Sequence, residues 1–395
     1  MADVRSSDRA RPIRIVGAGP AGLTAAIQLA RAGREVHVHE HKSGCGMRFS
    51  GDLQGVENWS TAHDALDELR ACGIETDFFC KPAKNLDMVG GREVTRLALP
   101  TAGWYLVERG AAATSLDQRL YAQALAAGVT VHFGSTLADD EADILATGPR
   151  KRDVVAVGKG IVFETSAPDM SVMLLGHALA RTGYSYLLIA DGRGVMCCGI
   201  FDKFETIHAC YDESARLIQS RYQFDIRSPK SFGGVEGFSL RPTFRRGRAL
   251  VVGEAAGVQD LLWGFGIRTA VRSGWLAARS LIEGTDYEAL ARAQLLPGMR
   301  ASAVARWLWE LARFDDYELA LKVLRAQRDQ VGFMRRAYGW SGLHRALYPI
   351  AAAALARRYK HFSAQAPSAA KLAEAATLAP VASQPALEPG VETQN

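Results

Sequence analysis

The stretch "IRIVGAGPAGLTAAIQLARAGREVHVHE", residues 13–40, decides the fold of the first part of the chain. A short apolar run enters a glycine-rich turn, a helical pattern follows and stops at Gly33, and an alternating pattern ends at Glu40. This change of hydrophobic period predicts a strand, a tight turn, a helix and a second strand, in that order. The expected fold class is therefore α/β, beginning with a Rossmann-like unit.

The turn of this unit carries Gly17, Gly19 and Gly22 in the spacing G-x-G-x-x-G. Gly17 permits the tight turn, Gly19 lets the backbone approach a pyrophosphate, and Gly22 lets the helix pack close to the strand. The helix N-terminus offers free N–H groups and a positive dipole end to the phosphates. Glu40 stands where a carboxylate accepts hydrogen bonds from the two hydroxyls of a ribose. We therefore expect a dinucleotide site here.

Composition narrows the class of protein. The 395 residues carry a net charge of +5, and the basic residues are scattered without a nucleic-acid motif, so nucleic acid is not an expected partner. Six cysteines show no metal-like or disulfide-like spacing, which favours a reduced, cytoplasmic protein. The start "MADVRSSDRARPI" lacks the apolar core of a signal peptide. The longest near-apolar run, residues 347–356, is too short to cross a bilayer.

A second strand-turn-helix pattern, "VVGEAAGVQDLLWGFGIRTA", occupies residues 251–270. It resembles the second flavin-binding motif of FAD enzymes in the p-hydroxybenzoate-hydroxylase-like fold group. The resemblance implies that Glu254 meets the ribityl or pyrophosphate region, and that Gly264, Gly266 and Ile267 form the turn and helix start beside the flavin. A positive helix end at that place would stabilise an anionic reduced flavin.

Two shorter segments extend the resemblance. "ATG" (146–148) is similar to the middle motif of the group, near the adenosine end, and "YLVERG" (105–110) to a segment whose arginine contacts the cofactor. FAD is therefore the expected cofactor, with NAD(P)H as a candidate electron donor. The residues expected to bind it are Gly17, Gly19, Pro20, Ala21, Gly22, Glu40, His41, Arg48, Arg109, Ala146, Thr147, Gly148, Gly253, Glu254, Gly264, Gly266 and Ile267.

Within that group the chain is most similar to the geranylgeranyl reductase family, over residues 12–285. The order of "GPAGLTAA", "CG" (45–46), "SLDQRLYAQALAAGV", "ADILATG" and "GEAAGVQDLLWGFGIRTAVRSGWLAARSL" carries this resemblance. It departs from the family at Glu254, where aspartate is usual, and at Trp263, which is bulkier than the usual residue. The resemblance implies hydride transfer from reduced flavin to an isolated alkene of a prenyl chain in an apolar tunnel. Cys45, Tyr184 and Tyr186 are candidates for the acid that completes the reduction.

Two alternatives stay open. One is an FAD-dependent monooxygenase of an aromatic or apolar substrate, although "ATGPRKRD" has Thr147 where aromatic hydroxylases of the group carry aspartate. The other is a non-redox user of the fold, either a flavin-dependent cyclase or a prenyl-lipid binding protein. The histidines of "HVHEH" (37–41) alternate along a strand that ends at the ribose acid, so packing explains them better than a metal does. We expect no metal site.

Changes in composition and in hydrophobic pattern along the sequence predict four parts of the chain. Residues 12–75, 100–150 and 245–290 form a discontinuous FAD-binding domain, and residues 76–99 and 151–244 an inserted, antiparallel β-rich substrate domain. Residues 291–362 form a C-terminal helical region, and residues 363–395 a disordered tail. Arg, Lys, Trp and Tyr among the apolar residues of the helical region suit either a lid over an apolar or lipid substrate or peripheral contact with the inner membrane face. The oligomeric state stays open.

Overall fold

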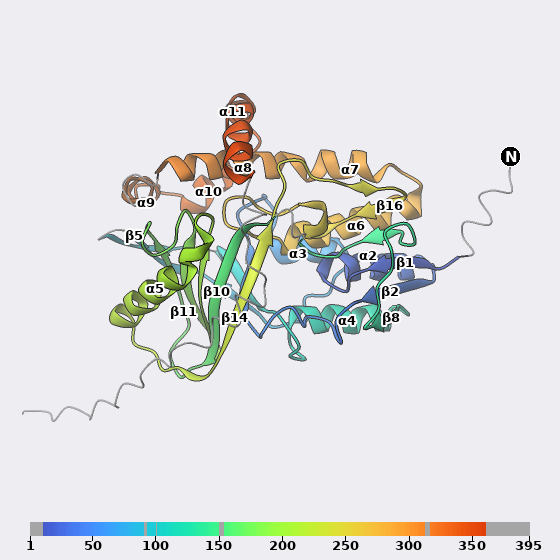
Figure 1. The fold of residues 1–395 in the computed structure, drawn as a ribbon, viewed down its shortest axis with the longest axis horizontal. Helices are drawn as coiled ribbons and strands as arrows, with labels where there is room; N and C mark the ends of the chain where they lie inside the picture. The colour runs from blue at the N-terminus through green and yellow to red at the C-terminus, as the bar shows by residue number, and fades with distance from the viewer. Residues whose placement is uncertain (1–10, 91–92, 100, 150–153, 313–316, 361–395) are drawn as a thin grey trace, which may run out of the picture.

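The computed structural model describes residues 11–90, 93–99, 101–149, 154–312 and 317–360 (Figure 1). The strand-helix-strand unit predicted at the start is confirmed, with β1 (Ile13–Val16), α2 (Pro20–Arg31) and β2 (Val36–Glu40). Strands β1 and β2 pair in parallel, with Ile13 opposite Val36. Pro20 begins α2, where its missing N–H removes no helical hydrogen bond.

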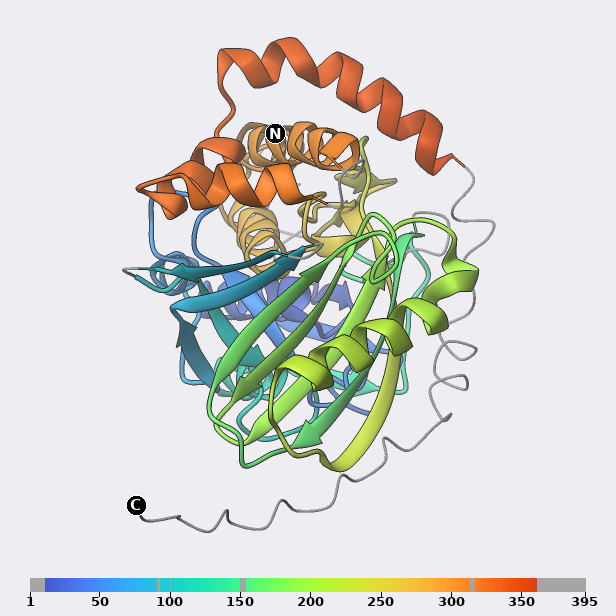
Figure 2. The same ribbon diagram turned by 90° about the vertical axis from the view of Figure 1, so that its left-hand side faces the viewer.

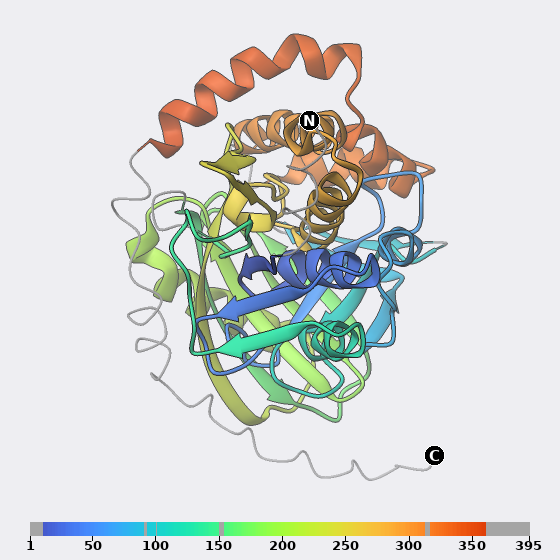
Figure 3. The same ribbon diagram turned by 90° about the vertical axis from the view of Figure 1, so that its right-hand side faces the viewer.

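This unit is the centre of a six-stranded sheet. In Figure 3 the blue and teal elements of this part of the chain face the viewer. All pairs are parallel except β15–β16. In spatial order the strands are β15 (Arg245–Arg246), β16 (Ala249–Val251), β9 (Ile144–Leu145), β1, β2 and β8 (Thr130–Phe133). Helix α6 (Ile267–Glu283) packs closely on α2. The contact requires glycine at position 274, because a Cβ there would clash with the Ala21 carbonyl oxygen. The second half of the chain therefore reaches the dinucleotide turn.

A seven-stranded sheet forms the second layer, seen face-on in Figure 2 with α5 (Ile207–Arg221) crossing its outer face. It is antiparallel apart from the parallel pair β11–β5. In spatial order its strands are β14 (Arg227–Gly237), β10 (Val154–Glu164), β13 (Arg193–Ile200), β12 (Tyr184–Ala190), β11 (Met170–Leu175), β5 (Asn85–Gly90) and β6 (Glu93–Ala98).

Strand β10 corrects one detail of the sequence interpretation. By sequence alone, "DVVAVG" (153–158) and "IVFET" (161–165) are expected as two short strands divided by glycines, but residues 154–164 form the single strand β10. Continuous pairing with β13 on one side and β14 on the other holds Gly158 and Gly160 in the sheet. A Cβ at Gly160 would lie 2.6 Å from the Met196 carbonyl oxygen, so glycine here permits close packing and makes no turn.

A three-stranded antiparallel sheet of β3 (Leu53–Glu57), β7 (Trp104–Glu108) and β4 (Cys80–Ala83) lies beside the two large sheets. Every strand of the six-stranded sheet comes from the segments assigned to the FAD-binding domain, and every strand of the seven-stranded sheet from those assigned to the substrate domain. The three-stranded sheet combines segments of both, so the domain bounds stay a prediction. Two helices accompany this part of the chain, α3 (Ala65–Ala71) and α4 (Leu116–Ala126). Short 3-10 turns occur at η2 (Phe204–Thr206) and η3 (Gly253–Ala256).

The last described elements are helices, which lie along the upper side of the molecule in Figure 1. They are α7 (Tyr287–Gln294), α8 (Leu296–Leu311), α9 (Glu318–Arg325), α10 (Gln330–Tyr338) and α11 (Gly342–Tyr359). Arg306 of α8 is fully buried and donates to Glu310 and to the Tyr359 hydroxyl of α11, which fixes the two helices together. The predicted tail 363–395 lies outside the described residues.

These layers confirm the predicted α/β fold class, a Rossmann-like sheet with an additional, mostly antiparallel sheet and C-terminal helices. In the described part of the chain, no helix has both the length and the hydropathy needed to cross a membrane. One buried cluster lies around α2 and the six-stranded sheet, and a second one joins the inner face of the seven-stranded sheet to helices α9 and α10. The candidate site lies where these two clusters meet.

Candidate functional site

One cavity of about 800 Å³ extends from the dinucleotide turn to the C-terminal helices. Its first part is lined by the turn Gly17–Ala21, by Glu40 and by the loop 146–149. Its middle part runs beside Gly253, Glu254 and the glycine turn 264–266. Its last part is apolar and lies between the seven-stranded sheet and helices α8 to α10. The cavity therefore joins both sequence motifs to a third region.

The glycines of the first turn differ in what surrounds them. Gly17 has a φ of +105°, and a Cβ on it would clash with the Ala146 carbonyl oxygen. A Cβ on Gly22 would clash with the Gly17 carbonyl oxygen, so this glycine permits close packing of helix and strand. At Gly19, by contrast, a Cβ would meet no atom within 4 Å. The space beside Gly19 opens into the cavity at the N-terminus of α2, where a phosphate group fits.

Glu40 is held in a fixed orientation at the end of β2. Its Oε2 accepts a hydrogen bond from the Ala18 N–H at 3.0 Å, and its Oε1 accepts one from the Lys42 N–H at 2.9 Å. The exposed His41 ring lies 2.9 Å from the same Oε1. Because the bonds from Ala18 and Lys42 come from the backbone, the carboxylate stays on the cavity with free lone pairs for hydroxyl groups.

Arg48 and Glu254 connect segments that are 206 residues apart. The Arg48 Nη1 donates to Glu254 Oε2 at 2.7 Å, and Glu254 Oε1 accepts from the Gly237 N–H at 3.2 Å. Gly253 has a φ of +62°, and its N–H donates to the Ser273 hydroxyl. The pair therefore positions the η3 turn against the cavity wall, where both residues were expected to meet a cofactor.

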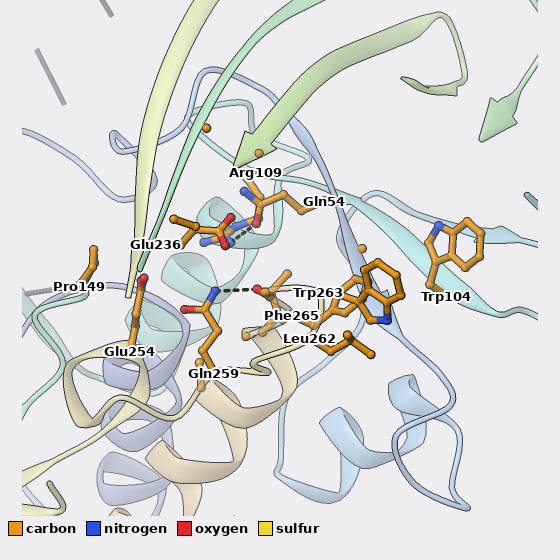
Figure 4. A pocket seen from close by; sticks show the side chains of 18 of the residues that line it. Gln54, Trp104, Arg109, Pro149, Glu236, Glu254, Gln259, Leu262, Trp263 and Phe265 are labelled. Carbon is orange, nitrogen blue, oxygen red and sulfur yellow. Dashed lines mark hydrogen bonds between the residues drawn. The ribbon is translucent and has the colours of Figure 1, made fainter. Parts of the chain in front are cut away.

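Arg109 lines the cavity but is mainly committed to its own surroundings. It donates to both Asp117 carboxylate oxygens at 2.9 Å and to Gln54 Oε1 at 2.9 Å, the bond drawn in Figure 4. Its guanidinium group also stacks over the Phe49 ring at 4.0 Å. Asp117 and Gln54 were not singled out from the sequence, because nothing in local spacing shows that an acid on α4 turns back to pair with this arginine.

The expected flavin-side turn follows Asp260. Gly264 has a φ of +80°, Gly266 precedes the helix α6, and Ile267 is the first residue of that helix. The Asp260 carboxylate accepts from the Trp263 N–H at 2.7 Å, while Gln259 Nε2 donates to the Gly264 carbonyl at 2.6 Å. The Oε1 of Gln259 is buried without a hydrogen-bond partner among the described residues. Gln259 lines the cavity, so this unsatisfied acceptor indicates a hydrogen-bond donor that the protein itself does not supply.

The loop of the middle motif also reaches the cavity. Ala146, Thr147 and Gly148 all line it, directly after β9. The Ala146 N–H donates to the Val16 carbonyl at 2.7 Å, which holds this loop against the first turn. Pro20 and Ala21 line the same end of the cavity. Of the residues expected to bind a cofactor, the structure thus brings all to this wall except Gly22, which packs beneath it.

The three candidates for a catalytic acid have different positions. Cys45 is buried in the core around α2 and lies away from the cavity wall, and burial raises the pKa of its thiol to about 12. Tyr184 and Tyr186 both line the cavity from β12, with ring centroids 5.9 Å apart. The Tyr184 hydroxyl donates to the Trp263 carbonyl at 2.6 Å. Burial raises the pKa of both tyrosines well above the usual value, which makes them weak proton donors.

Trp263 belongs to an aromatic cluster beside the flavin-side turn. Its ring lies 5.5 Å from that of Tyr184 and 4.9 Å from that of Trp309, both edge-on. Trp309 in turn stacks on Tyr317 at 4.3 Å. Trp263, at which the chain departs from the family that it resembles, therefore joins the turn to helix α8 and to the start of α9.

The far part of the cavity is an apolar chamber. Its walls come from β5, β6, β7, β12 and the C-terminal helices, and its lining includes Leu86, Met88, Leu97, Leu99, Trp104, Leu188, Ala305, Trp309, Leu321, Leu324, Phe333 and Met334. Trp59 closes it from the side, 5.3 Å from the Phe265 ring in an edge contact. These side chains favour an apolar occupant over a charged one.

Glu236 is a second acidic residue of the cavity, after Asp117, that was not singled out from the sequence. It lies on β14 one residue before the strand ends, and a Cβ on Gly264 would be 2.5 Å from its Oε2. Burial, followed by the negative charge of Glu254, raises the pKa of this carboxyl to about 7. A single acid near the end of a glycine-rich strand carries no motif, so only the three-dimensional structure reveals it.

Comparison with known proteins agrees with this fold. Residues 15–57 match the family model described as an NAD(P)-binding Rossmann-like domain. No sequence among the curated proteins matches the chain significantly. In the described residues, no group of three or more His, Cys, Asp or Glu side chains is arranged to hold a metal ion.

Several solved structures share the fold at low sequence identity. A geranylgeranyl bacteriochlorophyll reductase-like protein from Thermoplasma acidophilum is 17% identical with a TM-score of 0.65, over 86% of this chain and 98% of that one. The flavin-dependent brominase Bmp2 is 16% identical with a TM-score of 0.60, over 88% and 99%. The peptidyl tryptophan dihydroxylase QhpG is 20% identical with a TM-score of 0.56, over 79% and 78%. The predicted resemblance is thus confirmed at the level of the fold.

Proposed function

We propose that this chain is an FAD-dependent oxidoreductase that reduces C=C bonds of a prenyl or other apolar, lipid-like substrate. The observation that carries the proposal is the continuity of the cavity. One space runs from the dinucleotide turn, past the flavin-side turn, into a chamber with apolar walls. A long cofactor and an apolar substrate can therefore meet end to end inside the protein.

The polar part of the cavity fits FAD. The open space at Gly19 and the N-terminus of α2 would receive the pyrophosphate, and Glu40 the adenosine ribose. The Arg48–Glu254 pair would lie beside the ribityl chain, and the turn from Gly264 to Ile267 beside the flavin. When bound, FAD would supply hydride chemistry, with NAD(P)H as its electron donor.

The apolar part of the cavity is suited to exclude water from the reacting carbons. Trp263 and Trp309 pack against each other where the chamber meets the turn. Residues of helices α8 to α10 line the chamber, and we propose that these helices act as its lid. A covered site prevents loss of hydride equivalents to water or oxygen.

We assign the entrance of the chamber to the place where apolar side chains line the cavity and are also exposed at the surface of the protein. Leu308 of α8 and Val323 of α9 line the cavity, yet they are 46% and 42% exposed. An alkyl chain entering here would pass from one apolar surface directly to another. We propose that this rim takes up substrate from a lipid surface, which is the peripheral membrane contact expected from the sequence.

An anaerobic titration tests the proposed reaction. The purified yellow protein should lose its flavin absorbance on addition of NADPH or NADH, and regain it when geranylgeraniol is added without oxygen. Mass spectrometry of apolar molecules that copurify with the protein identifies the natural substrate class. A chain that retains FAD but is reduced by no donor contradicts the proposal and favours the cyclase or the lipid binder.

Oxygen consumption tests the monooxygenase alternative. The neighbours named above include a brominase and a dihydroxylase, so the shared fold also serves reactions that use oxygen. Under the proposed function, an apolar substrate does not increase oxygen uptake by the reduced protein. Uptake that rises in proportion to added substrate favours the monooxygenase instead.

A further inference from the structure

The proposed reduction requires a proton donor, and the described cavity contains a carboxyl group suited to this task. Adding hydrogen across a C=C bond takes one hydride and one proton. Cys45 lies outside the cavity wall, and Tyr184 already donates its proton to a backbone carbonyl. The remaining candidates on the cavity near the flavin-side turn are Tyr186, Cys197 and Glu236.

Glu236 differs from the other acids of the cavity because it lacks a partner. Glu40 and Glu254 each accept hydrogen bonds from backbone N–H groups, and Asp117 is paired with Arg109. Among the described residues, the backbone of Glu236 pairs with β10, but no hydrogen bond or ion pair joins its carboxyl group to another group. Figure 4 shows Glu236, Glu254 and Gln259 around the same part of the cavity. A carboxyl group without a partner is free to exchange its proton with whatever enters the cavity.

The location of Glu236 is at the junction of the two parts of the cavity. Its Oε2 lies against Gly264 of the flavin-side turn, so it is on the same wall as the expected flavin. Its strand neighbours Ala156, Val157 and Gly158 of β10 line the cavity around it. Tyr184 and Cys197 lie on the side of the chamber. A substrate carbon that reached the flavin would therefore pass this carboxyl group.

The charges that face Glu236 come from several elements. Glu254 and Asp260 disfavour its ionised form, while Arg48 and Arg306 favour it, and the loss of hydration outweighs the arginines. Tyr184 and Cys197 also face this carboxylate, whose negative charge adds to the rise of their own pKa values. The result is a pKa of about 7, whereas burial raises the pKa of Cys197 to about 12. Near neutral pH a large fraction of Glu236 is thus protonated, and its proton is far easier to transfer than that of Cys197.

We propose that Glu236 is the general acid of this site, and that it donates a proton to one carbon of the substrate alkene. This inference rests on the proposed function. The π bond breaks as its electron pair forms a C–H bond with the Glu236 proton, and the other alkene carbon takes the hydride that reduced FAD supplies. The alkene is reduced, the flavin is oxidised, and the Glu236 carboxylate regains a proton from water.

The first test uses bound FAD as a reporter and needs no substrate. The visible spectrum of bound FAD is recorded against pH for the wild type, for Glu236→Gln and for the control Glu164→Gln, an exposed acid at the far end of β10. The wild type and the control should show one transition with a midpoint at about 7. Glu236→Gln should retain FAD and lose that transition.

Each outcome of this test separates the two proposals. A wild-type protein that retains no FAD contradicts the proposed function itself. Retained FAD whose spectrum is the same in wild type and Glu236→Gln at every pH overturns only the assignment of Glu236. A transition that persists in Glu236→Gln assigns the titration to another group and has the same consequence.

The second test separates proton donation from structure. Anaerobic reoxidation of the fully reduced flavin by geranylgeraniol should be slower by about 100-fold or more in Glu236→Gln, whereas the control Glu164→Gln should be reoxidised at the wild-type rate. In the wild type this reoxidation should slow as pH rises above about 7, and in the variant it should not depend on that transition. Equal reoxidation rates in wild type and variant would overturn the role of Glu236.

Discussion

The two ends of the cavity are built in different ways. At the cofactor end, the conformation of the backbone determines the shape of the cavity. Gly17 has a positive φ, Gly22 permits close packing, and backbone N–H groups orient Glu40. At the chamber end, side chains from distant strands and helices supply apolar volume, with Trp104 from β7, Met88 from β5 and Phe333 from α10. The first end tolerates few residue types at each position, while the second requires only the right total volume.

The largest expected effect comes from comparing the same substitution at Gly19 and at Gly22. Gly19→Val should abolish FAD retention, weakening it by at least about 100-fold, because the added side chain occupies the open space at the N-terminus of α2. The cofactor-free variant should remain as stable as the cofactor-free wild type. Absorbance of the purified protein and thermal unfolding measure the two quantities.

Gly22→Val is the matched control for this prediction. The same side chain would clash there with the Gly17 carbonyl oxygen, inside the packed contact of α2 with β1. We expect it to destabilise the fold itself, by roughly 3 kcal/mol. If Gly19→Val kept stoichiometric FAD, or lost stability to the same degree as Gly22→Val, the distinction between an open and a packed glycine would be wrong.

The next effect concerns Glu236, where the two ends of the cavity meet. Because its folded-state pKa of about 7 is above the usual 4.5, the folded chain binds its proton more tightly than the unfolded chain. The resulting stabilisation is complete below about pH 4.5 and is lost as pH rises through about 7. Since the carboxyl is partly exposed to the cavity, we expect the free energy of unfolding to fall by on the order of 2 kcal/mol across this pH range.

Chemical unfolding of the cofactor-free chain at several pH values measures this change. Glu236→Gln should have a flatter dependence of unfolding free energy on pH across that range, and should be more stable than the wild type at about pH 8. An unchanged slope in the variant would show that Glu236 titrates normally in the folded chain.

The difference between the two ends also explains what the sequence could reveal. The turn at Gly17–Gly22 and the acid Glu40 follow local rules of spacing. The later turn at Gly264 was assigned to the same cofactor site because it resembles the second flavin-binding motif of a known group of FAD enzymes. Glu236 and Asp117 were missed, because their roles depend on which strand or helix lies opposite them. The chamber was expected only as a consequence of the family resemblance, since no short stretch encodes it.

Local reasoning also failed where neighbours decide the outcome. Gly158 and Gly160 were expected to divide two strands, and pairing on both sides keeps them within β10. Cys45 stays a candidate acid from the sequence, and its side chain lies in the core around α2. In both cases the residue type was compatible with two environments, and only the tertiary structure selects one.

A smaller effect is expected at Glu254. Glu254→Ala removes the acceptor of the Arg48 and Gly237 hydrogen bonds and should weaken FAD binding by about tenfold without unfolding the chain. Arg48→Gln should have a similar effect if the pair acts as a unit. FAD affinity from fluorescence titration of the cofactor-free chains checks both. Unchanged affinity in Glu254→Ala would mean that the second motif does not contact the cofactor.

The smallest effect tests the chamber entrance, by comparing two exposed leucines of the C-terminal helices. Leu308 is 46% exposed and lines the cavity, while Leu343 of α11 is 67% exposed and lies away from it. Leu308→Gln should weaken geranylgeraniol binding, followed by quenching of tryptophan fluorescence, by about threefold. Leu343→Gln should leave that binding unchanged, and neither variant should alter stability by more than about 0.5 kcal/mol, because both side chains are already largely in water. Equal weakening in both variants would indicate that the whole helical surface collects apolar molecules. The chamber end would then differ from the cofactor end in having no defined entrance.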